Sequence, residues 1–149
     1  MKSTIFSFLF SVIALASFAQ VSNDVYTRAE VMPVYKECAN EQLMAKPYFC
    51  TINQLMEEFK SSINVPNPIG KETKGLLSFV VNTDGSITDI QLERGVFVRI
   101  EDEAQKQEVQ SFLDNAIVEL ANTLSFNTPG YQDGEAVKVK VQFSVPVNY

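Results

Sequence analysis

Histidine is absent from all 149 residues of the chain. Histidine is the usual general base beside a serine or cysteine nucleophile, so the common Ser-His and Cys-His sites are unavailable. With no histidine and only two cysteines, the usual ligands of a zinc site are also lacking. The sequence shows neither a Gly-rich phosphate loop nor the ligand spacing of a metal motif. We therefore predict a protein that is not an enzyme and that uses no metal and no cofactor.

Basic side chains are also scarce. The chain carries 12 Lys and Arg against 18 Asp and Glu, a net charge of −6. A nucleic-acid-binding protein needs a basic stripe along its surface, and an acidic membrane surface attracts basic proteins for the same reason. This balance predicts no nucleic-acid partner and favours solubility.

Long apolar runs are missing everywhere except near the start. Lys2 precedes an uncharged run over Ile5–Phe18, and Ser17 and Ala19 then occupy the small-x-small positions of a cleavage site. This pattern is typical of a secretory signal peptide, here residues 1–19. The alternative is a retained anchor, but the run is shorter than the roughly 20 residues that span a bilayer. We predict cleavage after Ala19 and a periplasmic or secreted protein.

The two cysteines, Cys38 and Cys50, are both outside this segment. An even cysteine count in an exported protein predicts a disulfide. Catalytic dithiols usually have two residues between their cysteines, whereas eleven separate these. We therefore predict a structural bridge, which pins an irregular lead-in over residues 20–50. Within this lead-in, Val31–Tyr35 is a candidate short strand.

Two amphipathic helices are expected in the rest of the chain, residues 51–149. Thr51 and Gln54 form a capping-box pattern at the start of the first helix, and Val65–Pro68 ends it. Glu101–Glu103 opens the second, where acidic side chains suit the positive end of the helix dipole. The apolar positions that recur at helical spacing are Ile52, Leu55, Met56, Phe59 and Ile63 in the first helix, and Val109, Phe112, Leu113, Ala116, Ile117, Leu120 and Leu124 in the second.

Three strands complete the expected domain. Leu76–Val81 and Ile87–Leu92 flank an Asp-Gly turn and predict a hairpin. Val137–Val147 alternates apolar and polar residues, which is the signature of a half-buried strand. Its outward lysines and Pro146 are typical of a sheet edge, where another chain can pair. The fold class is thus α+β, a three-stranded antiparallel sheet packed by two helices.

The order of several short motifs resembles the TonB C-terminal domain family, in particular its divergent Bacteroidetes-type members. The closing part combines Phe126, Pro129-Gly130, Gln132, Gly134 and Val137 with an alternating strand ending Val145-Pro146-Val147. The central part matches the family's first hairpin through Gly75, Phe79-Val80-Val81, Asp84-Gly85-Ser86-Ile87, Asp89-Ile90 and Arg94-Gly95. Some of these relatives also carry a Pro and two Cys ahead of the first helix, as Pro33, Cys38 and Cys50 do here. The resemblance covers roughly residues 31–149.

This resemblance implies a non-catalytic module that binds an extended peptide or protein segment beside its last strand, by β-augmentation. The family's partner is an outer-membrane receptor. The matching residues of this chain are Val137, Lys138, Val139, Lys140, Val141, Gln142 and Phe143. The chain lacks the Pro-rich spacer of an energy transducer, and a cleaved signal would leave no anchor with which to transmit force.

Alternative functions remain open at the level of sequence. If the N-terminal segment is retained as an anchor, the chain is a TonB-like component of receptor-dependent transport. The edge strand could instead join two copies of the chain into a homodimer. A disulfide-bearing protease inhibitor is a further class, with Phe126–Glu135 as its loop.

Overall fold

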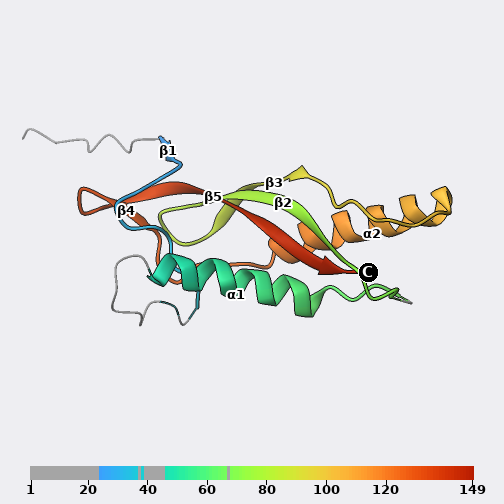
Figure 1. The fold of residues 1–149 in the computed structure, drawn as a ribbon. Coiled ribbons are helices and arrows are strands. Elements are labelled where there is room, and N and C mark those ends of the chain that lie inside the picture. Colours follow the sequence, from blue (N-terminus) through green and yellow to red (C-terminus); the bar gives the residue numbers. More distant parts are fainter. Residues whose placement is uncertain (1–23, 37, 39–45, 67) are drawn as a thin grey trace, which may run out of the picture.

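A computed structural model describes residues 24–36, 38, 46–66 and 68–149. The chain forms two helices and a curled sheet; in Figure 1 α1 runs below the sheet, and α2 extends from beneath it to the right. The elements are β1 (Val25–Tyr26), α1 (Lys46–Ser62), β2 (Glu72–Val81), β3 (Ile87–Arg94), α2 (Glu103–Ala121), β4 (Gly130–Gln132) and β5 (Glu135–Asn148).

The sheet is mixed, with strand order β1-β5-β2-β3 and β4 paired with β5. The expected three-stranded antiparallel sheet is present as β5-β2-β3. It is incomplete as a description, because β1 adds a parallel pairing and β4 a further antiparallel one. Strands of two and three residues are too short to show a period of two, so hydrophobic alternation could not reveal them.

Alternation along β5 gives the sheet one buried face. Five alternate residues of β5 are almost fully buried, whereas Gln142 between them is exposed. The helices cover this buried face, with α1 packed against β5 and α2 against β3. The core joins Leu55 and Phe59 of α1, Leu113 and Ile117 of α2, and the inward side chains of the sheet. The buried residues of β5 are Val139, Val141, Phe143, Val145 and Val147.

Helix α1 begins earlier than its capping pattern predicts. It starts at Lys46, and Pro47 lies in its first turn, where a proline loses no intrahelical hydrogen bond. Thr51 is therefore inside the helix, and its hydroxyl oxygen accepts a hydrogen bond from the Tyr35 amide at 3.0 Å. Cys50 also lies within α1, so the predicted boundary between lead-in and domain does not coincide with a structural break.

Helix α2 follows its prediction closely, except that it ends at Ala121, before Leu124, and that one residue of its stripe is exposed. Asp102 is the N-cap, and its carboxylate accepts from the Gln105 amide at 2.7 Å, as expected for an acidic residue before the first turn. Leu113, Ile117 and Ala121 are buried. Phe112, which the sequence pattern placed in the core, is 42% exposed.

The lead-in runs back along the C-terminal part of the chain. Val31 and Tyr131 exchange two backbone hydrogen bonds of 3.0 and 2.9 Å, and Val34 pairs with Thr128. The expected strand at Val31–Tyr35 is thus reduced to two isolated bridges. The predicted signal peptide lies outside the described residues, and none of the helices described is long and apolar enough to cross a membrane.

The disulfide predicted between Cys38 and Cys50 is confirmed. It joins the lead-in to the first turns of α1 across a sequence separation of 12 residues. On the chain-entropy model a loop of this length contributes roughly 3 kcal/mol. We expect the Cys38→Ser, Cys50→Ser variant to lose about 2–3 kcal/mol of unfolding free energy in urea titrations. An unchanged midpoint would contradict this structural role.

A glycine in the β2–β3 turn is constrained by its neighbour. Gly85 has φ +83°, and a Cβ there would overlap the carbonyl oxygen of Phe126. Phe126 cannot easily move away, because its amide donates a hydrogen bond to the Gly85 carbonyl. Gly134 has a similar φ of +78° with nothing within 4 Å of such a Cβ. We expect Gly85→Ala to destabilise the protein clearly more than Gly134→Ala, whose cost is only the left-handed backbone, about 1 kcal/mol. Thermal unfolding of the two variants measures the difference.

Candidate functional site

The hydrogen-bonding phase of β5 decides which of its backbone groups face outward. Lys71 and Tyr149 exchange both backbone hydrogen bonds, at 3.0 and 2.8 Å. The ladder from Glu72↔Asn148 to Val81↔Val139 continues from this pair without a register shift. Because hydrogen-bonded and non-hydrogen-bonded pairs alternate in antiparallel strands, the odd-numbered residues of this part of β5 bond to β2. The even-numbered residues direct their N–H and C=O groups away from β2.

Pro146 agrees with this phase. It belongs to the even-numbered set and pairs with Lys74 without needing an N–H toward β2. The backbone groups on the outer flank of β5 therefore come from Lys140, Gln142, Ser144 and Asn148, with only a carbonyl from Pro146. The outward-facing donors and acceptors thus form a short row centred on Gln142 and Ser144.

The chain itself covers the first part of the predicted binding edge. Lys138 and Val139 pair with β1 on the outer flank, and Val137 is engaged by Gly130 of β4 on the flank that β2 occupies farther along the strand. From Val141 onward, the described residues supply no strand on the outer flank of β5. Of the predicted edge Val137–Phe143, the structure thus leaves open the C-terminal half, and the open flank extends beyond it to Ser144. Sequence patterning could not show this, since β1 has only two residues.

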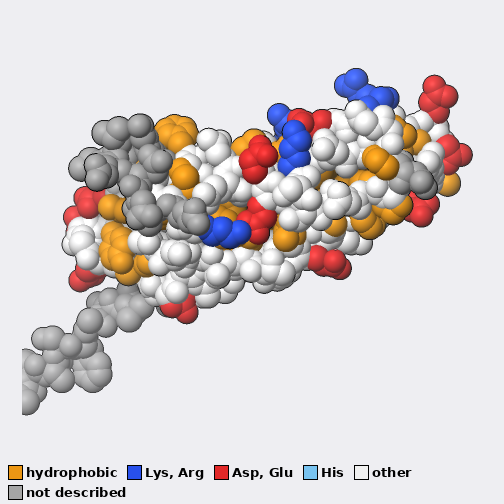
Figure 2. Space-filling model, turned by 90° about the horizontal axis from the view of Figure 1, so that it is seen from below, with side chains coloured by type: hydrophobic (Ala, Val, Ile, Leu, Met, Phe, Trp, Pro, Cys, Tyr) orange, Lys and Arg blue, Asp and Glu red, His pale blue; other side chains and the backbone are white. Residues whose placement is uncertain are grey.

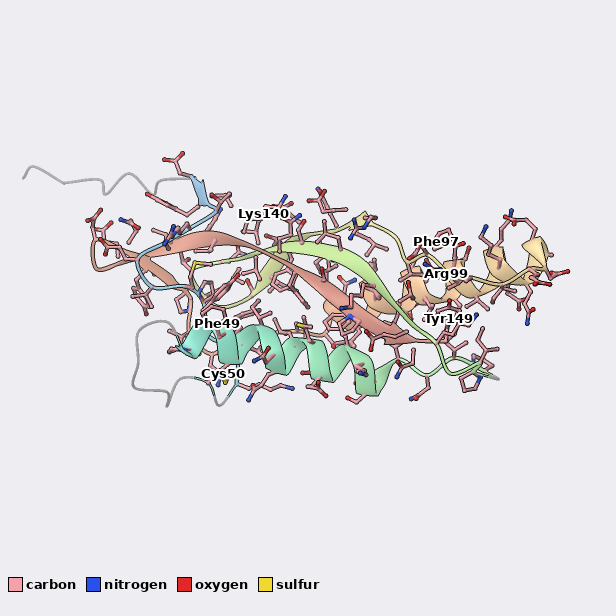
Figure 3. All side chains as sticks on the ribbon, in the orientation of Figure 1. Phe49, Cys50, Phe97, Arg99, Lys140 and Tyr149 are labelled. Atoms are coloured by element: carbon pink, nitrogen blue, oxygen red, sulfur yellow. A yellow bond between two sulfur atoms is a disulfide. The ribbon has the colours of Figure 1, made fainter. Side chains whose placement is uncertain are left out.

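A row of apolar side chains lies on α1, the helix that packs against β5. Phe49, Ile52 and Met56 are spaced three and four residues apart and so share one side of the helix. Phe49 is 67% exposed, and Ile52 and Met56 are partly buried. Figure 3 shows Phe49 at the N-terminal end of α1, the end of the helix that lies toward the start of β5. We call these three residues the α1 shoulder.

The direction of the shoulder follows from the contacts on the other side of α1. Glu58 lies on that other side, and its carboxylate accepts a hydrogen bond of 2.8 Å from the Tyr35 hydroxyl. The ring of Tyr35 lies 5.3 Å from that of Phe126, which lies 5.7 Å from the ring of Phe79 in β2. This side of α1 therefore faces the β2–β3 half of the sheet, and the shoulder faces the outer flank of β5. Burial raises the pKa of the Tyr35 hydroxyl, so it stays a neutral donor to Glu58.

On the helix-free face, Lys140 belongs to a polar cluster. Its ammonium lies 2.9 Å from the Glu93 carboxylate, which also accepts a hydrogen bond of 2.7 Å from the Ser78 hydroxyl. Lys140 and Ser78 hold the pKa of the Glu93 carboxyl below its ordinary value. This cluster ties β5, β2 and β3 together beside the open flank.

The other edge of the sheet is poorly suited to pairing. Strand β3 shifts register twice against β2, and Asp89 has φ +52°. Its side chains are mostly exposed and polar, including Asp89, Gln91 and Arg94. Bulges and charges of this kind protect an edge strand from adding a further strand.

The predicted inhibitor loop is largely immobilised. Phe126 is buried between Tyr35 and Phe79, and β4 pairs with β5 on one side and with Val31 on the other. Within this loop the exposed residues are Asn127 and the turn over 133–135. Within the described part of the chain, no group of three or more Cys, Asp or Glu residues could hold a metal ion.

No protein-family model, curated protein or solved structure matches this chain. The resemblance to TonB C-terminal domains therefore stays a prediction from sequence motifs, and the site is argued from its own geometry.

The Glu93 cluster has a defined pH dependence. A carboxyl with a depressed pKa stabilises the folded state above the unfolded-state pKa of about 4.5 and loses this contribution as the pH falls through the folded pKa. We expect NMR titration to place the Glu93 pKa below the ordinary glutamate value of 4.5. Lys140→Met should raise the Glu93 pKa, because the hydrogen bond from the Lys140 ammonium lowers that pKa the most. A Glu93 pKa that does not respond to Lys140→Met would contradict the pairing.

Proposed function

We propose that this protein is a non-catalytic binding module that captures an extended peptide or protein segment on the outer flank of β5. The observation that carries the proposal is the phase of the β2–β5 ladder, which turns the amides of Gln142 and Ser144 outward while leaving that flank without a strand from the described residues. Main-chain hydrogen bonds to these groups supply affinity in β-augmentation. The signal-like start of the chain supports a periplasmic or secreted location.

The surroundings of the flank favour a segment of particular pattern. Successive side chains of an added strand point to opposite faces of the sheet. Those pointing toward the helices meet the α1 shoulder of Phe49, Ile52 and Met56, so apolar side chains suit these positions. Those on the other face lie beside Gln142 and Ser144 and remain near solvent, so polar side chains suit them. The preferred partner is thus a segment of alternating apolar and polar residues.

Two limits define the length of the captured segment. β1 occupies the flank at Lys138 and Val139, and Pro146 lacks an N–H at the other end. The open ladder between these limits spans about five residues. It extends to roughly 17 Å at the rise of a strand. This length favours a short linear motif as the ligand.

Proline substitution at adjacent positions separates folding from capture. Val141→Pro removes an N–H that faces β2 and leaves its partner carbonyl unpaired. We expect a loss of about 1–3 kcal/mol or more in chemical denaturation, and in the extreme no folded protein. Gln142→Pro removes only an outward N–H, as Pro146 does naturally, and we expect nearly unchanged stability with peptide capture lost.

The measurement uses a library of random extended octapeptides displayed on phage and selected on the immobilised protein. Peptides so selected should protect the Gln142 and Ser144 amides from hydrogen exchange and should not bind the folded Gln142→Pro variant. Lys138→Ala is the control and should bind normally, since one surface charge contributes little. Selected peptides that bind Gln142→Pro as well as the natural chain would rule out capture at this flank.

A further inference from the structure

A second surface, remote from the flank of β5, is formed between the helices. One cavity of about 380 Å³ lies between the end of α1 and the C-terminal half of α2. A neighbouring cavity of about 250 Å³ continues along α2 toward its start. Phe112 lines both, so the two form one groove. Figure 2, which views the molecule from below, shows hydrophobic side chains gathered along this part of the surface with acidic ones beside them.

Apolar side chains line the groove on both sides. Phe112, Ala116 and Leu120 follow one another at a spacing of four residues on α2, so they form one stripe. Ile63 and Val65, just beyond the end of α1, lie opposite them. The exposure of Phe112, at 42%, leaves much of an aromatic ring in water. Burying such a ring is a large favourable contribution to binding.

Two carboxylates stand at the two ends of this stripe. Glu108 lines the smaller cavity and Glu119 the larger one. The two residues are eleven positions apart, on the same side of α2. At 1.5 Å per residue their separation along the axis is about 16 Å. Neither makes a salt bridge with the described residues, whereas Glu103 in the first turn of α2 pairs with Lys106. None of the described residues lining the groove is Lys or Arg.

We propose that this groove binds a basic amphipathic helix of another protein. Its apolar stripe packs on Phe112 and its neighbours, and two Lys or Arg side chains eleven positions apart pair with Glu108 and Glu119. A helical occupant is favoured because the residues of the α2 wall recur at helical spacing, which suits side chains presented at the same spacing by a helix lying alongside. The charge pattern selects a basic occupant, because an acidic one would meet both carboxylates.

The site is separate from the proposed strand-capture edge. The open flank runs along β5 from Val141, whereas the groove lies between the end of α1 and α2. The two can therefore be tested independently, and loss of one leaves the other intact.

The experiment uses a fluorescein-labelled synthetic helix that carries leucines on one stripe and two lysines eleven positions apart beside them. A matched peptide carries glutamates at the two lysine positions. We expect fluorescence anisotropy to show saturable binding of the lysine peptide to the purified protein and at least tenfold weaker binding of the glutamate peptide.

Protein variants locate the contact. Glu108→Gln with Glu119→Gln should weaken binding of the lysine peptide by about tenfold and flatten its salt dependence, because two ion pairs are lost. Phe112→Ala should weaken it by about tenfold at all salt concentrations. Glu57→Gln with Glu101→Gln is the control, because it removes the same charge from exposed positions outside the groove and should change affinity by less than about twofold.

Three results would overturn the proposal. The first is a lysine peptide that shows no saturable binding. The second is a control variant that weakens binding as much as the groove variant, because the effect would then come from net charge alone. A third is self-association: if sedimentation shows that the natural chain forms a dimer that Phe112→Ala dissociates, a second copy covers the groove.

Discussion

The pairing of β2 with β5 is the interaction on which the rest of the structure depends. Ten consecutive residue pairs run from Glu72↔Asn148 to Val81↔Val139 without a slip. A slip of one residue would move every inward valine of β5 to the helix-free face and remove the surface on which α1 and α2 pack. The same register fixes which amides of β5 bond internally and which face outward. Core packing and the candidate binding edge are therefore set together, by a single ladder.

Helix α1 illustrates how one element serves several surfaces. Leu55 and Phe59 point into the core, and Glu58 and Thr51 hold the lead-in through Tyr35. The third side carries the α1 shoulder beside the open flank of β5. Because the disulfide fixes the start of this helix to Cys38, the position of the shoulder relative to β5 depends on the lead-in as well as on the core.

Much of this could be predicted from the sequence wherever a pattern was long enough. The period-two alternation of β5 and the helical stripe of α2 identified both elements and most of their buried residues, because burial of one face imposes these periods. Thr51 was predicted as a helix cap, because its hydroxyl could equally cap a helix or bond to another segment. Here the hydroxyl accepts a hydrogen bond from the Tyr35 amide of the lead-in. Phe112 was expected in the core because its spacing fits the stripe, but the end of α1 stops short of covering it. The pairing of β1 with Lys138 and Val139 joins residues more than a hundred positions apart, which no local pattern reveals.

The parallel arrangement of β1 and β5 has a mechanical consequence. Val25 pairs near the beginning of β5, and Tyr149 follows its far end, so the two ends of the described chain leave the sheet at opposite ends of the same strand. Tension applied between them acts along the strand axis and loads the backbone bonds of β5 side by side. Such a sheet yields by shear, several bonds at a time, and not by unzipping from one end.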